Sequence, residues 1–144
     1  MEYVKVTKYD DIVNLIYEFK DVFPNVTVNE HTAESFAEKF CKYATVVQLT
    51  SYSEVAGMAV YYANDTKQKI GYISLIGLKK EFRGKHLGRD LLKFVIDDMR
   101  THNMNFVKLE CADTNINAYH FYCKMGLDPA ERAGKESFYM TMCL

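Results

Sequence analysis

The sequence predicts a single mixed α/β domain, built on a central β-sheet with helices packed against it. The first observation is an apolar run over residues 70–78, typical of a buried strand, followed by a basic loop and an amphipathic helix. The second is an alternating strand over 106–111 after that helix, because a strand–helix–strand order favours parallel neighbours joined by a right-handed crossover. The third is the hydrophobic content, 49% of 144 residues, which suffices for one sizeable core.

The N-terminal third predicts one strand and two helices. Residues 3–6 alternate in polarity and are expected to form the strand. An apolar helical stripe runs from Ile12 to Phe19, and the segment Phe23-Pro24-Asn25 breaks that helix. A second helix is predicted to begin near Thr32, where apolar residues again recur at helical spacing.

The middle of the chain predicts a hairpin and then the central strand. Residues 45–49 and 55–62 are expected to pair across a polar turn, and a second polar turn precedes residue 70. The strand over 70–78 is apolar almost throughout, which favours burial on both of its faces. The helix after it is expected to run to about His102.

The C-terminal part predicts one more helix and a final strand. Ala118, Phe121, Tyr122 and Met125 form an apolar stripe, and Gly126 is a plausible helix stop. Residues 128–136 are expected to be rich in turns, and the alternating residues 138–144 should form the last strand.

Composition argues against several classes of function. The formal net charge is −1, with 18 basic and 19 acidic side chains, which does not favour general nucleic-acid binding. The sequence shows neither a signal peptide nor an apolar run of membrane-spanning length. The four cysteines lack a C-x-x-C pair, so we expect reduced thiols in a cytoplasmic protein. The protein is expected to be a monomer or a homodimer. No metal site is expected, because no ligand spacing relates the histidines His31, His86, His102 and His120.

The loop Arg83-Gly84-Lys85-His86-Leu87-Gly88 carries the first functional signal. It opens a helix, whose first N–H groups lack intrahelical partners and whose dipole is positive at that end. Glycines allow a close backbone approach, and Arg83, Lys85 and Arg89 add positive charge. This arrangement predicts a pyrophosphate site. The nucleotide loop ending in Gly-Lys-Ser/Thr and the three-glycine dinucleotide fingerprint are both absent.

The same loop resembles the Arg/Gln-x-x-Gly-x-Gly/Ala signature of the Gcn5-related N-acetyltransferases, the GNAT family. Arg83 and Gly88 match it, and His86 stands at the first signature glycine. His86 fits if it adopts ordinary dihedral angles or a left-handed conformation, which histidine tolerates better than most residues. The resemblance implies acetyl-CoA as co-substrate, with its pyrophosphate held by Arg83, Gly84, Lys85, His86, Leu87, Gly88 and Arg89.

The stretch from Asn115 to Leu127 resembles a second GNAT signature. It reads Asn115-x-x-Ala118-x-x-Phe121-Tyr122-x-Lys124-x-Gly126-Leu127, and it departs from the signature only at Leu127, where the family has phenylalanine. It implies that Asn115 contacts coenzyme A and that Tyr122 lies beside its sulfur. Taken alone, Asn115 would be a helix cap and Tyr122 a core residue. The predicted order, βααβββαβαβ with a possible further strand, is also that of the GNAT fold, whose mixed sheet has six or seven strands and about four helices.

The reaction implied by the resemblance is acetyl transfer from the thioester to an amine by direct attack. Ile76 and Leu78 would pair with the pantetheine amides, and Gly77 would permit a bulge or a close approach. Tyr122 would protonate the departing sulfur. Glu110 is the candidate base, with Glu81, His120 and a water chain left open.

The acceptor stays open between a small amine and a protein or peptide amine. The resemblance implies that it enters near residues 21–31 and 128–136, which carry charges of both signs. Two alternatives also stay open. One is a non-catalytic acyl-CoA-binding module, and the other is a partner-binding domain without a cofactor.

Overall fold

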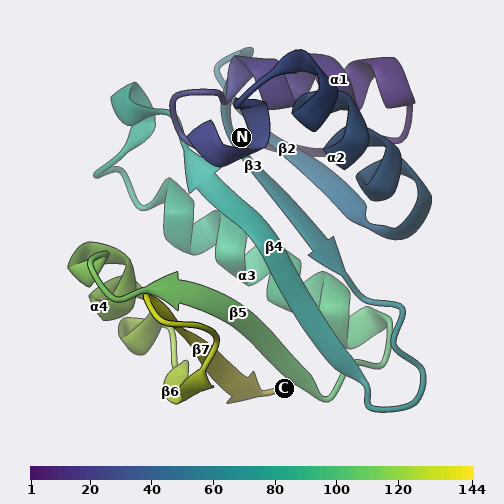
Figure 1. The fold of residues 1–144 in the computed structure, drawn as a ribbon. Helices are drawn as coiled ribbons and strands as arrows, with labels where there is room; N and C mark the ends of the chain where they lie inside the picture. Colours follow the sequence, from purple (N-terminus) through teal and green to yellow (C-terminus); the bar gives the residue numbers. More distant parts are fainter.

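The computed structural model describes residues 1–144 and contains one mixed sheet of seven strands in the order β1-β2-β3-β4-β5-β7-β6 (Figure 1). Only the β4–β5 pair is parallel. None of the helices combines the length and apolar character that a membrane span requires. The elements are β1 (Glu2–Lys5), α1 (Tyr9–Glu18), α2 (Glu30–Tyr43), β2 (Thr45–Ser51), β3 (Glu54–Tyr62), β4 (Ile70–Leu78), α3 (Leu87–Thr101), β5 (Phe106–Ala112), α4 (Ile116–Lys124), β6 (Asp128–Arg132) and β7 (Ser137–Cys143).

The predicted mixed α/β sheet is confirmed, with two differences in its elements. Helix α2 begins at Glu30 because Asn29 caps it, accepting a 2.9 Å hydrogen bond from the backbone N–H of Thr32. Residues 128–132 form strand β6 and not turns, because they pair with β7 at the outer edge of the sheet. The two short strands at the end of the chain therefore form an antiparallel hairpin.

Helices cover both faces of the sheet, and strand β3 contributes to both cores. Its residues Ala59 and Tyr61 pack with α3, whereas Met58 and Val60 pack with α1 and α2. This alternation follows from the two-residue period of a strand. Figure 1 shows α3 passing behind β3 and β4, with α1 and α2 at the opposite end of the picture from α4.

Strand β4 is less buried than its apolar sequence predicts. Only Gly71 and Ile73 are buried, and the other residues of the strand are half-buried. The reason is that β4 pairs with β5 only from Ile70↔Phe106 to Ile73↔Leu109. The strand that is buried almost throughout is β3, which has a paired neighbour on each side.

The sheet forks beyond Ile73. The β3–β4 register shifts between Val60 and Tyr61 and leaves Ser74 as an extra residue of β4, which is a β-bulge. Strand β5 then continues beside β7 as far as Ala112. The second half of β4 consequently faces a gap in the sheet on its β5 side, with no strand beside it there.

Helix α3 is fastened to the sheet near its C-terminal end by Asp98. The hydroxyl of Tyr61 donates to Asp98 Oδ2 at 2.6 Å, and Lys5 Nζ donates to Oδ1 at 3.2 Å. Burial favours a higher pKa for this carboxyl, but the hydrogen bonds from Tyr61 and Lys5, with the nearby charges, hold the pKa of Asp98 below its usual range. The bonds join β1, β3 and α3, which steadies the helix whose other end faces the fork.

Candidate active site

A cleft of about 780 Å³ opens at the fork. It is bounded by the α1–α2 connection, the second half of β4, the loop before α3 and the face of α4. Among the residues predicted to bind the cofactor, Lys85 and Leu87 do not line it. Those that do are Ile76, Gly77, Leu78, Arg83, Gly84, His86, Gly88, Arg89, Asn115 and Tyr122. Segments far apart in the sequence therefore meet around one space.

The loop before α3 presents its backbone to this cleft. His86 is the N-cap residue of α3 and has φ 63° and ψ 10°, which is the left-handed conformation. The sequence allows either ordinary or left-handed dihedral angles for His86, and the structure shows the left-handed ones. Glycine would adopt this conformation without strain. No side chain caps the helix, so the first N–H groups of α3 remain available to an anion.

The basic side chains of the loop differ in what they contact. Arg83 turns back on the strand, and its Nε and Nη2 donate to the carbonyl oxygen of Leu78 at 3.3 and 3.2 Å. Lys85 lies outside the cleft, with Nζ 5.8 Å from the ring centroid of Phe82. Leu87 packs against the α3 side of the core. Arg89 also lines the cleft but, unlike Arg83, forms no hydrogen bond with the backbone.

Strand β4 turns unpaired backbone toward the fork. The N–H of Lys79 donates to the Ala56 carbonyl of β3 at 2.9 Å, so the neighbouring polar groups of Leu78 face the opposite side. The hydrogen bond from Arg83 to Leu78 O agrees with that direction. By alternation, Ile76 faces the fork as well. The predicted pairing positions, Ile76 and Leu78, are therefore the ones whose backbone groups are directed into the gap.

Gly77 lies close against the α1–α2 connection, and the bulge lies at Ser74. A Cβ atom at Gly77 would lie 2.8 Å from Val22 Cγ1 and 2.9 Å from Phe23 Cζ. The α1–α2 connection thus closes one side of the cleft with two apolar side chains. Both residues lie in the stretch 21–31, which the resemblance places near the acceptor, but no role is predicted for either side chain.

Helix α4 places Asn115 and Tyr122 along the cleft. Asn115 is the N-cap residue, and its Oδ1 accepts a hydrogen bond from the N–H of Ala118 at 3.2 Å. Tyr122 follows seven residues later, close to two helical turns, so both side chains lie on nearly the same face. Burial, with a smaller contribution from Cys111, raises the pKa of Tyr122 to about 12. Its hydroxyl is therefore protonated at neutral pH and able to donate.

Glu110 lies at the mouth of the fork and not inside the cleft. It follows Leu109, the last residue of β5 that pairs with β4. Leu109 and Cys111 are buried in the core on the α3 side, so Glu110 projects from the opposite face of the sheet. Ser137 Oγ donates to Glu110 Oε2 at 2.8 Å, and Glu110 takes part in no ion pair. The other candidate bases, Glu81 and His120, do not line the cleft.

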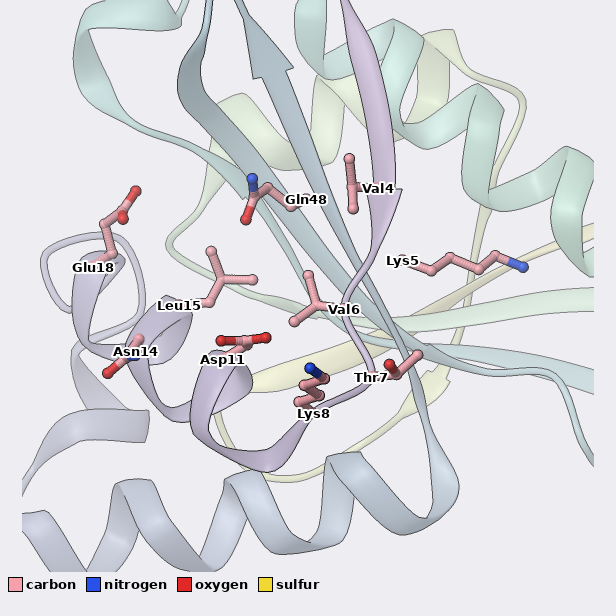
Figure 2. Close-up of a pocket in the computed structure, with 10 residues that line it drawn as sticks. All are labelled: Val4, Lys5, Val6, Thr7, Lys8, Asp11, Asn14, Leu15, Glu18 and Gln48. Carbon is pink, nitrogen blue, oxygen red and sulfur yellow. The ribbon is translucent and has the colours of Figure 1, made fainter.

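A second hollow, of about 360 Å³, lies between β1 and α1 (Figure 2). Val6 and Leu15 point into it, whereas Lys5 extends away from the other labelled side chains. Glu18, one of the carboxylates that line it, forms an ion pair with Lys79, in which Nζ lies 2.6 Å from Oε2. None of the catalytic or cofactor-binding residues predicted from the sequence lines this hollow. The structure also brings no three His, Cys, Asp or Glu side chains together as a metal centre.

Comparison with known proteins gives one family. The model of the acetyltransferase (GNAT) family matches residues 11–127. No protein in the curated set matches the chain. Among solved structures, an acetyltransferase from Thermus thermophilus superposes with a TM-score of 0.81 at 12% identity, covering 100% of this chain and 98% of the other.

Two further structures carry chemical information about themselves. The ribosomal-protein-S18-alanine N-acetyltransferase from Escherichia coli has a TM-score of 0.75 at 18% identity, over 99% of this chain and 94% of its own. A Bacillus anthracis structure in complex with acetyl coenzyme A has a TM-score of 0.63 at 19% identity, over 71% and 63%. At these identities the structural likeness shows the fold.

Proposed function

Because the chain belongs to the acetyltransferase (GNAT) family, we propose that it transfers the acetyl group of acetyl-CoA to a primary amine. The observation that carries this proposal is the convergence at the fork. An uncapped helix N-terminus, a strand edge without a partner and a protonated tyrosine all border one cleft. Each of these groups matches one part of an acyl-CoA: the pyrophosphate, the amides of the pantetheine arm and the sulfur.

Binding would use the backbone more than side-chain charge. The first N–H groups of α3, reached through Gly84, His86 and Gly88, would hold the pyrophosphate, with Arg89 nearby. The pantetheine arm would lie along β4 as an added strand. Because Arg83 already occupies the Leu78 carbonyl, we infer that Leu78 offers its N–H and that Arg83 acts by holding the strand end in place.

The chemistry needs one proton acceptor and one proton donor. We assign the acceptor role to Glu110, which stands on the open face beside the fork and would take the proton of the incoming ammonium. The amine nitrogen then bonds to the acetyl carbon while the carbon–sulfur bond breaks. Tyr122, which is protonated at neutral pH, would donate its proton to the departing sulfur. The second proton, which the nitrogen loses as it becomes an amide, would return Tyr122 to its protonated form.

The acceptor is an amine of a small molecule, a peptide or a protein. The alternative is a non-catalytic acyl-CoA-binding module of the same fold. Tyr122 favours the enzyme, because a module that only binds acyl-CoA has no need of a proton donor near the sulfur. Release of free thiol from acetyl-CoA in the presence of an amine distinguishes the two.

Thermal unfolding tests the binding step. A ligand that binds only the folded protein at a hundredfold excess over its Kd stabilises it by about 2.7 kcal/mol, which for a chain of this size raises the Tm by roughly 6–10 °C. We expect this shift with acetyl-CoA, free coenzyme A and dephospho-coenzyme A, and a smaller one with NAD or ATP. An unchanged Tm at saturating acetyl-CoA would contradict both the enzyme and the binding-module assignments.

A further inference from the structure

The end of the cleft that would hold the acyl group follows from the residues that line it. The loop that would hold the pyrophosphate follows β4, so an arm that pairs with the strand runs from Leu78 toward Ile76. Ile76 is the residue of β4 farthest from that loop that still lines the cleft. The thioester and its acyl group would therefore lie beside Ile76 and Gly77, with Tyr122 on the α4 side.

Two apolar side chains of the α1–α2 connection form a wall at this end of the cleft. Val22 and Phe23 line it, and no other residue of α1, α2 or their connection does so. A Cβ atom on Gly77 would lie 2.8 Å from Val22 Cγ1 and 2.9 Å from Phe23 Cζ, and real Cβ atoms essentially never show contacts below 3.0 Å. The wall therefore touches the strand segment beside which the acyl group would lie.

Helix α1 holds this wall in place. The N–H groups of Val22 and Phe23 both donate to the carbonyl oxygen of Phe19, at 3.0 and 2.9 Å. Phe19 is completely buried, and its ring stacks on that of Phe23 with centroids 6.3 Å apart. Lys79, the residue after β4, forms an ion pair with Glu18 at the end of α1, in which Nζ lies 2.6 Å from Oε2. The wall is thus fixed both to a buried ring and to the end of β4.

We propose that Val22 and Phe23 are specificity-determining residues, which limit the acyl group of the co-substrate to the two carbons of acetyl. This inference rests on the proposed function and narrows its co-substrate class. The acetyl methyl group would contact the two apolar side chains, whereas a longer acyl chain would have to enter the space that they occupy. Additional methylene groups stabilise a complex where space is available and destabilise it where the site is already packed.

Calorimetric titration with free coenzyme A, acetyl-CoA, propionyl-CoA and butyryl-CoA tests the inference without an acceptor. Butyryl-CoA should bind the wild-type protein about tenfold or more weakly than acetyl-CoA, the effect of overpacking. Propionyl-CoA should lie between them. Phe23→Ala removes the ring and should bind butyryl-CoA at least as tightly as acetyl-CoA, because each methylene group that fits is worth about fourfold in affinity. Free coenzyme A should bind both proteins alike.

Two further variants control for folding and for general effects on the connection. Val22→Ala opens the wall to a smaller extent and should shift the acyl preference in the same direction, which keeps the inference testable if Phe23→Ala does not fold. Val28→Ala changes an exposed valine of the same connection that does not line the cleft, and it should leave all of the affinities unchanged. The Tm of each variant without ligand shows whether it is folded.

The outcomes separate the inference from the proposed function. Failure of acetyl-CoA to bind the wild-type protein would remove the proposed function itself. Binding of acetyl-CoA and butyryl-CoA with equal affinity would overturn the inference and leave acetyl-CoA binding standing. An unchanged ratio of these two affinities in folded Phe23→Ala and Val22→Ala would also overturn it, because the wall would then contact only the arm that all acyl-CoAs share.

Discussion

Replacing Tyr122 with phenylalanine is expected to lower kcat by at least about tenfold, because the loss of a general acid typically costs about 10²–10⁴ in rate. The substitution removes only the hydroxyl, and the ring keeps its packing in the core beside Phe121. With a pKa of about 12, the wild-type hydroxyl carries its proton through the neutral range and can deliver it to the sulfur. The fold and the acetyl-CoA affinity should therefore survive the change.

Three measurements on Tyr122→Phe distinguish catalysis from packing. They are kcat with a working acceptor, the Tm and an acetyl-CoA titration. A purely structural Tyr122 would make the variant almost silent in turnover. Near wild-type kcat in a well-folded protein would therefore refute the proton-donor role and leave water or another group to protonate the sulfur.

Gly88→Val is expected to weaken acetyl-CoA binding by about 10–100-fold. A Cβ atom at Gly88 would lie 3.7 Å from Leu78 Cδ1 and 3.8 Å from Phe121 Cζ, which is ordinary contact, so the protein should still fold. The two further methyl groups of valine would extend into the cleft at the first turn of α3. Overpacking of this kind costs about 1–3 kcal/mol, and each 1.4 kcal/mol is about a tenfold change in affinity.

Two variants of the same loop serve as controls for Gly88→Val. Lys85 lies outside the cleft, and Lys85→Ala should lower the affinity only a few-fold, as expected for one exposed charge. His86→Gly fills no space and relieves a left-handed residue, so it should bind at least as well as the wild type. A greater loss in Lys85→Ala than in Gly88→Val would show that charge dominates. A large loss in His86→Gly would show that the imidazole contacts the ligand.

The loop before α3 and the start of that helix could be predicted from the sequence because their signals are local. The positive end of α3 follows from the basic, glycine-containing stretch before an amphipathic helix, which depends on nearby residues alone. The roles expected of Asn115 and Tyr122 instead come from the resemblance to the GNAT signature, and helical geometry adds only that the two side chains share a face of α4. For His86, which stands where the family signature has glycine, the sequence allows ordinary or left-handed dihedral angles, and the structure shows the left-handed ones.

The parts that could not be predicted depend on distant strands. The fork arises because β5 separates from β4 after Leu109 and continues to pair with β7. No residue within β4 indicates where the two strands separate. The apolar run of β4 therefore predicts burial on both faces, whereas most of its residues are half-buried in the structure. Val22 and Phe23 lie in the stretch 21–31, which the resemblance places near the acceptor, but their contact with Gly77 depends on the packing of α1 and α2. The strand β6 likewise forms through its pairing with β7 and not through its own sequence.

Hydrogen exchange of the backbone amides with and without acetyl-CoA tests most directly where the ligand binds. A ligand that orders a segment slows its exchange by suppressing local opening. We expect protection in the second half of β4, at Ile76 and Leu78, and in the first turn of α3 after His86. Exchange around the hollow between β1 and α1 should not change. Binding with protection confined to that hollow, or with exchange of Ile76 and Leu78 unchanged, would contradict the assignment of the fork as the acetyl-CoA site.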